Sequence, residues 1–168
     1  MIIRKAGPDD RMLLKQIVPT PDEGAYLACC LSGPEATTRD VFLAHIDDGQ
    51  GTAPVGYGIL NHAPRYALYK RLGMPEIQNL YVHPDWRGRG VAGALMDYCE
   101  AQVRGAGGAM IGVSVGLTKE YGPAQRLYVK RGYVPDGYGV TRDREPVPVG
   151  AVIPVDDDLC LMLVKDLG

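Results

Sequence analysis

The chain has 168 residues and a mass of 18.2 kDa, with 46% hydrophobic and 23% charged residues. This length and composition are typical of a soluble globular protein, and we expect one domain over residues 1–168. The formal net charge of -2 provides no bulk positive charge for nucleic-acid binding. No apolar run reaches the length of a membrane span, and the first residues lack a signal-peptide pattern. We therefore expect a cytoplasmic protein that binds neither nucleic acid nor membrane.

The four cysteines indicate neither a disulfide framework nor a zinc site. They are scattered along the chain without C-x-x-C spacing, at Cys29, Cys30, Cys99 and Cys160. Reduced thiols in a cytoplasmic protein explain this distribution better than structural disulfides do. Histidines and carboxylates show no metal-ligand spacing either, so we expect no metal.

In chain order, the first half of the sequence predicts short strands and helices. Apolar alternation indicates strands, whereas apolar residues spaced three or four apart indicate helices. Pairs of strands around Gly-rich or Asp-rich segments indicate hairpins. The predicted elements are a strand at 2–6, a short helix around 12–17, a helix at 23–31, a strand at 41–46, a turn at 47–51, a strand at 55–60, and a loop at 61–75 with or without a helical turn.

The second half begins with an apolar strand and continues with two helices. The first helix has an apolar face formed by Val91, Leu95, Tyr98, Cys99 and Val103. Gly132 is placed to end the second helix. The predicted elements are a strand at 76–82, a helix at 90–104, a strand at 110–115, a helix at 123–131, a strand starting at 133–134, a long loop at 135–158 broken by prolines and glycines, and a last strand at 159–164.

The segment at 77–96 predicts an anion site. A β-prone run ends at a His-Pro turn, and a loop rich in arginine and glycine leads into a helix. The first backbone N–H groups of a helix lack intrahelical partners and can bind phosphate. Small residues allow close approach to that backbone, and arginines add charge that can fork onto phosphate oxygens. The residues concerned are Arg87, Gly88, Arg89, Gly90, Val91, Ala92 and Gly93.

Other interpretations of these glycines are a dinucleotide fingerprint, a P-loop and a structural turn. Gly88, Gly90 and Gly93 satisfy G-x-G-x-x-G, but five residues separate the first glycine from the end of the strand at Val82. The following strand also ends in Gly116 rather than in an acidic residue for a ribose. No Gly-Lys-Ser/Thr follows, which excludes a P-loop. A purely structural turn before a helix remains an alternative.

Two motifs together resemble the GNAT superfamily of N-acetyltransferases. Arg87-x-x-Gly90-x-Ala92, preceded by Leu80-Tyr81-Val82, is similar to its acetyl-CoA motif, Q/R-x-x-G-x-G/A after a strand L-x-V. The segment at 121–133 is similar to N-x-x-A-x-x-L-Y-x-K-x-G-F/Y. It matches at Ala124, Leu127, Tyr128, Lys130, Gly132 and Tyr133. Tyr121 stands where the family usually has Asn, so one hydrogen bond to the pantetheine arm is in question.

The resemblance covers most of the chain and implies both a fold and a cofactor. The fold is α+β, with a mixed, mostly antiparallel central sheet that splays at its middle and helices on both faces. The chain looks like a member of a bacterial, small-molecule-type subgroup. The implied co-substrate is acetyl-CoA, without a metal. Its implied contacts are Leu80, Tyr81, Val82, Arg87, Gly88, Arg89, Gly90, Val91, Ala92, Gly93, Tyr121 and Tyr128.

The implied reaction transfers acetyl to a primary amine by direct attack in a ternary complex. Backbone N–H groups of Tyr81 or Val82 are expected to stabilise the oxyanion. Tyr128 stands where the family keeps its general acid, and Glu76 stands at the head of the central strand, where several members carry a base. A core role for Tyr128 and a structural role for Glu76 are the alternatives. His62 and His83 are alternative bases.

The acceptor is expected to be a small-molecule or peptide amine. An acidic run, Asp156 to Asp158, suggests attraction of a cation, whereas the basic loop with Arg65, Lys70 and Arg71 suggests an anionic group on the acceptor. Other functions left open are a non-catalytic acyl-CoA binding module and a dinucleotide-binding oxidoreductase. The assembly state is also open, with a homodimer among the alternatives.

Overall fold

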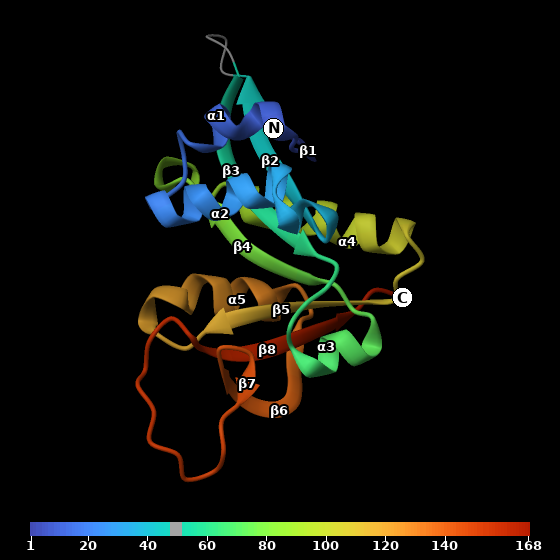
Figure 1. Cartoon of the computed structure of the whole chain (residues 1–168), viewed down its shortest axis with the longest axis vertical. Helices are drawn as coiled ribbons and strands as arrows, with labels where there is room; N and C mark the ends of the chain where they lie inside the picture. The colour runs from blue at the N-terminus through green and yellow to red at the C-terminus, as the bar shows by residue number, and fades with distance from the viewer. Residues whose placement is uncertain (48–51) are drawn as a thin grey trace. The chain divides into compact units, whose positions relative to one another are not determined.

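A computed structural model describes residues 1–47 and 52–168, so most of the turn expected at 47–51 lies outside the described residues. The chain forms two compact units. Unit 1 comprises Met1–His62 with Ile77–Gln102, and unit 2 comprises Ala63–Glu76 with Val103–Gly168. Figure 1 labels their helices and strands. The predicted α+β class, a mixed sheet with helices, is confirmed.

Unit 1 contains four neighbouring strands in the order β1-β2-β3-β4. The pairs β1/β2 and β2/β3 are antiparallel, with a register shift between Ala44 and His45. The strand predicted at 76–82 is confirmed with the same bounds. The strands and helices of this unit are β1 (Ile2–Lys5), α1 (Arg11–Leu14), α2 (Pro21–Ser32), β2 (Arg39–Asp47), β3 (Thr52–Asn61), β4 (Glu76–Val82) and α4 (Val91–Gly105). The first residue of β4, Glu76, and the last residues of α4 belong to unit 2.

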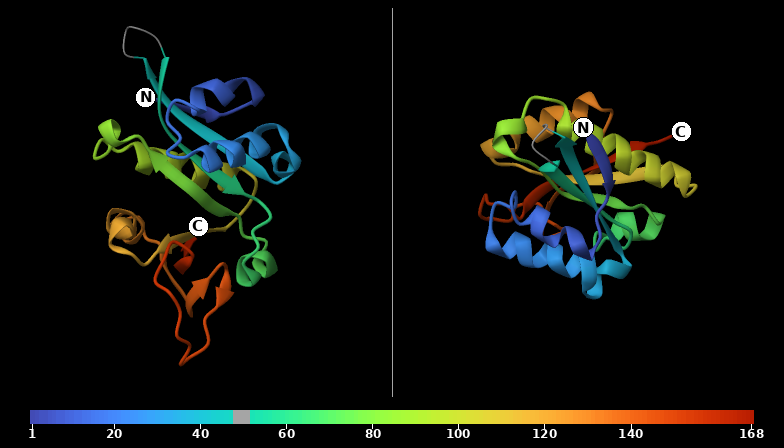
Figure 2. Two further views of the ribbon diagram at one scale, coloured as in Figure 1. Left: turned by 60° about the vertical axis from the view of Figure 1, so that its left-hand side comes forward. Right: turned by 90° about the horizontal axis from the view of Figure 1, so that it is seen from above.

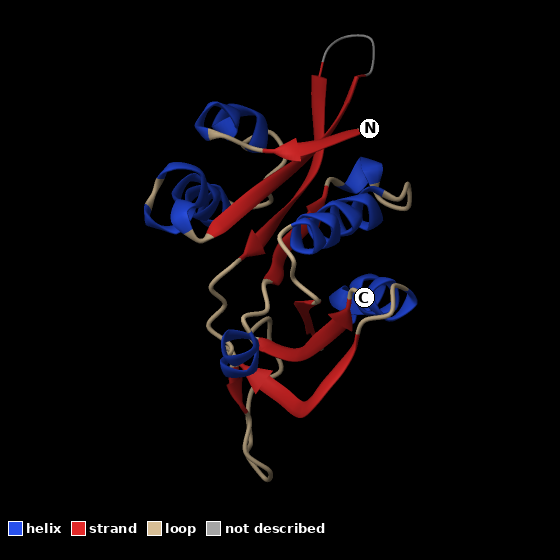
Figure 3. Cartoon of the chain, turned by 90° about the vertical axis from the view of Figure 1, so that its right-hand side faces the viewer, coloured by secondary structure: helices blue, strands red, loops and turns tan. Residues whose placement is uncertain are grey.

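Successive side chains of β2 point to opposite faces of the strands, and unit 1 therefore has an apolar core on each face. Val41 and Leu43 pack in one cluster with their cross-strand partners Ile59 and Tyr57 and with apolar residues of α1 and α2. The intervening Phe42 contacts the ring of Tyr98 in α4 with a centroid distance of 5.0 Å. Side chains alternate across a strand, so α1 and α2 cover one face and α4 covers the other (Figure 3).

Unit 2 contains the strands in the order β5-β8-β6-β7, with antiparallel pairing of β5/β8, β6/β8 and β6/β7. The predicted loop at 61–75 does contain a helical turn. The predicted end of the second helix at Gly132 is also confirmed, because this glycine has φ 84° and follows the last helical turn. The helices and strands of this unit are α3 (Ala67–Leu72), β5 (Met110–Gly116), α5 (Gly122–Lys130), β6 (Val134–Arg142), β7 (Glu145–Pro146) and β8 (Leu159–Asp166).

The prediction of a continuous loop at 135–158 is wrong, because β6 and β7 occupy part of it. Pro135 and the left-handed Gly137 and Gly139 interrupt the apolar alternation that would have identified a strand. The pairing of β6 with β8 shifts register between Pro135 and Val140. Strand β6 is therefore defined by hydrogen bonding to a distant partner rather than by its own sequence pattern.

Tyr69 is the central side chain of unit 2. It is fully buried, and its hydroxyl donates to the carbonyl oxygens of Leu163 at 2.6 Å and Val113 at 3.3 Å, in β8 and β5. Its ring lies over Gly112, where an added Cβ would be 2.4 Å from the ring. Gly112 is thus required for space rather than for backbone conformation. It lets α3 anchor both strands through one phenol.

We expect Gly112→Ala to lower the free energy of unfolding by about 1–3 kcal/mol, because the anchored Tyr69 ring cannot move aside freely. Denaturant unfolding measures this change. Gly7→Ala is the matched control, since Gly7 has an ordinary φ of -115° and no atom lies within 4 Å of its added Cβ. Equal stability of Gly112→Ala and Gly7→Ala contradicts the packing assignment.

Candidate active site

The predicted anion site lies in unit 1, between the end of β4 and the start of α4. The chain leaves Val82, passes through a short 3-10 helix (Pro84–Trp86), and enters α4 at Val91 (Figure 2). Ala94 N–H donates to the Gly90 carbonyl at 3.0 Å, which closes the first turn of the helix. The N–H groups of Val91, Ala92 and Gly93 precede that bond and have no intrahelical acceptor.

Two left-handed glycines open this loop. Gly88 has φ 73° and Gly90 has φ 82°, and in both cases no atom lies within 4 Å of an added Cβ. Glycine is the residue that adopts this backbone without a steric cost. The loop that leads into α4 is therefore uncrowded at both glycines, and the first N–H groups of the helix can donate to phosphate oxygens. We call the loop and first turn, residues 87–93, the cradle.

Both arginines of the cradle are held by aromatic rings and are exposed. Arg87 Nε donates to the Val82 carbonyl at 3.1 Å, and its guanidinium lies 5.9 Å from the ring centroid of Tyr81. Arg89 lies 4.7 Å from the ring centroid of Trp86. Arginine has five N–H donors, so these contacts leave others for a phosphate. Trp86 was not predicted as a site residue, although it directly precedes Arg87 in the sequence.

Tyr81, Leu80 and Val82 form the end of β4, which approaches β3 very closely. A Cβ on Gly56 would be 2.7 Å from the Tyr81 carbonyl oxygen, and one on Gly58 would be 3.2 Å from the Leu80 side chain. Tyr81 stacks on Tyr57 with a centroid distance of 5.5 Å. Glycines in β3 therefore set the position of the strand from which the cradle starts. Sequence reasoning missed them, because nothing local distinguishes a glycine that is required for close approach.

Tyr128, the predicted general acid, lies on α5 in unit 2. It is buried, with its ring centroid 6.1 Å from that of Tyr133. Burial, with a smaller contribution from Tyr121, raises the pKa of Tyr128 to about 12. A phenol with this pKa stays protonated at neutral pH. Tyr128 can therefore donate a proton but does not serve as a base there.

Tyr121, which replaces the usual Asn, lies just before α5. An added Cβ on Gly116 of β5 would be 2.4 Å from the Tyr121 ring, so the ring packs directly against that backbone. Gln125 Nε2 donates to the Gly116 carbonyl at 2.8 Å. Burial and the neighbouring carboxylate of Asp157 raise the pKa of Tyr121. The tyrosine thus fills space beside the end of β5.

Glu76, the predicted base, is fully buried and forms an ion pair in unit 2. Its Oε1 lies 3.0 Å from Nη2 of Arg144. Asp143 and Arg144 have φ 47° and 70° and form the two-residue turn between β6 and β7. Paired positive φ values are characteristic of a type I′ hairpin turn. The hairpin turn therefore delivers the counter-charge, and no sequence signal linked the two residues.

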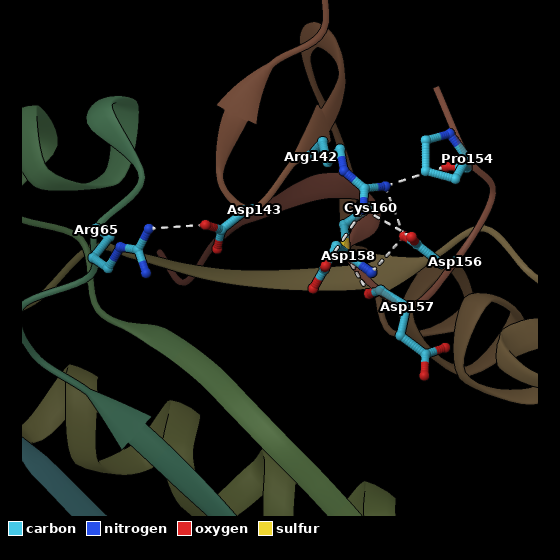
Figure 4. A network of polar contacts seen from close by, with 8 residues as sticks. All are labelled: Arg65, Arg142, Asp143, Pro154, Asp156, Asp157, Asp158 and Cys160. Carbon is cyan, nitrogen blue, oxygen red and sulfur yellow. Dashed lines mark hydrogen bonds and ion pairs between the residues drawn. The ribbon is translucent and has the colours of Figure 1, made fainter. Parts of the chain in front are cut away.

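The acidic run before β8 is largely engaged within unit 2 (Figure 4). Arg142 forks onto Asp156 at 2.8 and 2.7 Å and lies 3.6 Å from Asp158. The carboxylate of Asp157 points away from Arg142, and burial together with this carboxylate raises the pKa of the Tyr121 hydroxyl. Arg65 of the basic loop forms an exposed ion pair with Asp143 at 3.3 Å. Asp156, Asp158 and Arg65 thus have partners within unit 2, and the sequence did not distinguish such pairing from acceptor recognition.

Within residues 1–47 and 52–168, no group of three or more His, Cys, Asp or Glu side chains could hold a metal ion. Over the same residues, no helix is both long and apolar enough to cross a membrane. The four cysteines are free thiols, of which Cys29 is exposed.

Comparisons with known proteins identify the family and the fold. A sequence model of the acetyltransferase (GNAT) domain matches residues 37–135, more than half of the chain. A GNAT-family structure from Desulfovibrio desulfuricans has 19% identity and a TM-score of 0.72, and the match covers 99% of each chain. The yncA structure from Salmonella typhimurium, which contains acetyl-CoA, has 16% identity and a TM-score of 0.65, covering 100% of this chain and 94% of the other.

A third similar structure is an aminoglycoside 6'-acetyltransferase type Ii, with 21% identity, a TM-score of 0.66, and coverage of 99% of this chain and 97% of the other. No match was found among curated protein sequences. The structural likenesses establish the fold, and the domain match covers both β4 and the cradle. The chain therefore belongs to the GNAT acetyltransferase family.

Proposed function

We propose that this protein transfers an acetyl group from acetyl-CoA to a primary amine of a small molecule or peptide. The observation that carries the proposal is the first turn of α4, which follows a loop that is uncrowded at two left-handed glycines. Free amides, the positive end of the helix dipole and two exposed arginines together make a site for a pyrophosphate. The acetyl-CoA bound in the yncA structure supports acetyl-CoA as the acetyl donor. The similarity to an aminoglycoside 6'-acetyltransferase supports an amine as the acceptor.

The cradle is proposed to bind the pyrophosphate of acetyl-CoA. The amides of Val91, Ala92 and Gly93 donate to phosphate oxygens, and Arg87 and Arg89 neutralise their charge. Backbone of β4 is proposed to bind the pantetheine and the developing oxyanion. The β4 residues are Leu80, Tyr81 and Val82, and the remaining cofactor contacts are Gly88, Gly90, Tyr121 and Tyr128.

Tyr128 is proposed as the general acid. Acetyl-CoA supplies the acetyl group as a thioester. When the amine nitrogen bonds to the carbonyl carbon and the C–S bond breaks, the sulfur leaves with the electron pair and takes a proton from the Tyr128 hydroxyl. The raised pKa of Tyr128, about 12, keeps that proton available at neutral pH. The amine gives up a proton to solvent, and solvent returns a proton to the Tyr128 phenolate, which balances the reaction.

Glu76 is better assigned to structure than to proton abstraction. A catalytic base must reach the acceptor's proton or a bridging water, whereas this carboxylate is fully buried against Arg144. Water, His62 or His83 remains for the proton transfer. His62 forms a hydrogen bond with Asp40 at 3.1 Å, and His83 Nδ1 accepts from the N–H of Asp85 at 3.4 Å.

The proposal is tested by incubating the protein with acetyl-CoA and a panel of primary amines while following loss of the thioester. Direct thioester absorbance is preferable to a thiol reagent, because the exposed Cys29 would react with that reagent. A non-catalytic module binds acetyl-CoA without releasing CoA. An oxidoreductase instead gains melting temperature from a nicotinamide dinucleotide.

We expect Gly90→Val to weaken acetyl-CoA binding at least tenfold, because valine disfavours the left-handed backbone that opens the cradle. Calorimetry measures the affinity. Gly107→Val is the matched control: Gly107 has φ 81° and equally open surroundings, but follows the other end of α4. Unchanged affinity in folded Gly90→Val, or an equal loss in Gly107→Val, contradicts the cradle assignment.

We expect Tyr128→Phe to lower kcat by about 10²-fold with little change in acetyl-CoA affinity, because the ring stays and only the proton donor is lost. In the wild type, deprotonation of Tyr128 should remove activity only as the pH rises toward about 12. The kcat profile should therefore show no loss from this group up to roughly pH 10. An unchanged kcat assigns Tyr128 to packing.

We expect Glu76→Gln to lower the free energy of unfolding by about 1–4 kcal/mol, because Arg144 loses its buried counter-charge. The folded variant should keep at least a third of the wild-type kcat. Thermal unfolding and steady-state kinetics measure the two effects. Wild-type stability combined with a large loss of kcat would restore Glu76 as the base.

A further inference from the structure

Glu23, a carboxylate of unit 1, is held against the sheet by neutral donors. Its Oε1 accepts from the Tyr57 hydroxyl at 3.1 Å and from Asn79 Nδ2 at 2.7 Å. Tyr57 is in β3, Asn79 is in β4 and Glu23 is in α2, so three elements meet at one oxygen. Both contacts use Oε1, and among the described residues Oε2 has no protein donor.

The Glu23 side chain makes these contacts instead of the local capping interaction that its position in α2 allows. It occupies the third helical position after the N-cap Thr20, whose hydroxyl oxygen accepts from Glu23 N–H at 3.2 Å. In this Thr-x-x-Glu pattern the carboxylate ordinarily folds back to the N-cap backbone. Here it turns to the sheet instead. Its position is therefore set by Tyr57 and Asn79 rather than by helix capping.

Asn79 marks this point of β4 as irregular and accessible. It has φ 48° within a strand and is exposed. Left-handed backbone at a non-glycine residue is uncommon, and such residues gather at functional sites. Asn79 lies two residues before Tyr81, the strand end proposed to receive the acetyl-pantetheine, and Tyr81 stacks on the same Tyr57 that binds Glu23. The carboxylate thus lies beside the strand segment that the reaction uses.

The chemistry of the site suits a cation. The two protein donors on Glu23 are neutral, and no Lys or Arg pairs with it among the described residues, so its negative charge is oriented but not compensated. The opposite holds for Glu76, whose charge is balanced by Arg144. A half-buried carboxylate with one free oxygen binds an ammonium group through a charge-assisted hydrogen bond.

We propose that Glu23 binds the ammonium group of the acceptor, with Oε2 as the accepting oxygen and with Tyr57 and Asn79 as positioning residues. The inference rests on the proposed function and adds the charge of the acceptor. It predicts selection of cationic amines over neutral molecules of the same shape. It also makes Glu23, rather than the acidic run at 156–158, the principal source of that selection.

The test is Glu23→Gln. The Tyr57 and Asn79 donors orient the amide oxygen to the Oε1 position, so both internal hydrogen bonds are retained while Oε2 becomes an NH₂ donor. Asp22→Asn is the matched control, because it removes the same charge from the exposed neighbouring residue in the same helical turn. The probes are 2-phenylethylamine, 1,4-diaminobutane and glycinamide, with 2-phenylethanol as the neutral isostere. Calorimetry measures their binding, and acetyl-CoA binding is measured on the same samples.

We expect Glu23→Gln to weaken amine binding at least tenfold, with acetyl-CoA affinity unchanged. Asp22→Asn should stay within twofold of wild type for every amine. Full amine affinity in Glu23→Gln, equal losses in both variants, or tighter binding of the alcohol than of the amine overturns the inference, as does a wild type that binds none of the amines. Failure of the proposed function appears separately, as absent acetyl-CoA binding.

Glu23→Asp gives a second test if the glutamine variant is unstable. It keeps the charge but shortens the side chain by one methylene, which withdraws the carboxylate from β3 and β4. Amine affinity should fall about three- to tenfold, with a melting temperature that confirms folding. Unchanged affinity in Glu23→Asp contradicts the requirement for a carboxylate positioned by Tyr57 and Asn79.

Discussion

The close approach of β4 to β3 is the constraint on which unit 1 depends. At Gly56, a single added carbon would meet the Tyr81 carbonyl at 2.7 Å and the Val91 side chain at 3.2 Å. The same glycine therefore fixes the end of β4 and the first residue of α4. His83 N–H then donates to the Val55 carbonyl at 2.9 Å, which ties the start of the loop to β3. The position of the cradle is therefore set by the packing of the β3 backbone against β4 and α4. The arginines of the loop add positive charge at this position.

Glu76 and Glu23 differ in how their negative charge is balanced, and this difference is the basis for proposing a structural role for Glu76 and a binding role for Glu23. Glu76 has an arginine as its partner and no exposure, which is the usual condition for keeping a buried carboxylate ionised. Glu23 has two neutral donors and a free oxygen. The family resemblance made Glu76 a candidate base, with a structural role as the alternative. The identity of the partners is the basis on which we propose Glu23 rather than Glu76 as the residue that contacts the acceptor.

Local features could be predicted from the sequence, whereas long-range partners could not. Strand 76–82, the helix that follows it and the two glycines of the cradle are encoded by adjacent residues, and all were predicted. Arg144 contacts Glu76 from a hairpin turn whose two residues are non-glycine and have left-handed backbone. The sequence of this turn lacks the glycine that would have predicted it. Strand β6 and the contacts of Glu23 likewise depend on distant segments. The family resemblance implied a reaction, but the environment of each carboxylate depends on residues that are distant in the sequence.

The interior of this protein is rich in tyrosine side chains, and their ionisation limits the stability of the fold at high pH. The chain has ten tyrosines and one phenylalanine. Burial raises the pKa of six of these tyrosines, so the folded state favours the protonated phenol. Their contribution to stability is full below the ordinary tyrosine pKa of about 10 and is lost as the pH rises through the higher folded values. Strong base should therefore unfold the chain cooperatively as these phenols ionise, and the residues concerned are Tyr26, Tyr57, Tyr66, Tyr69, Tyr121 and Tyr128.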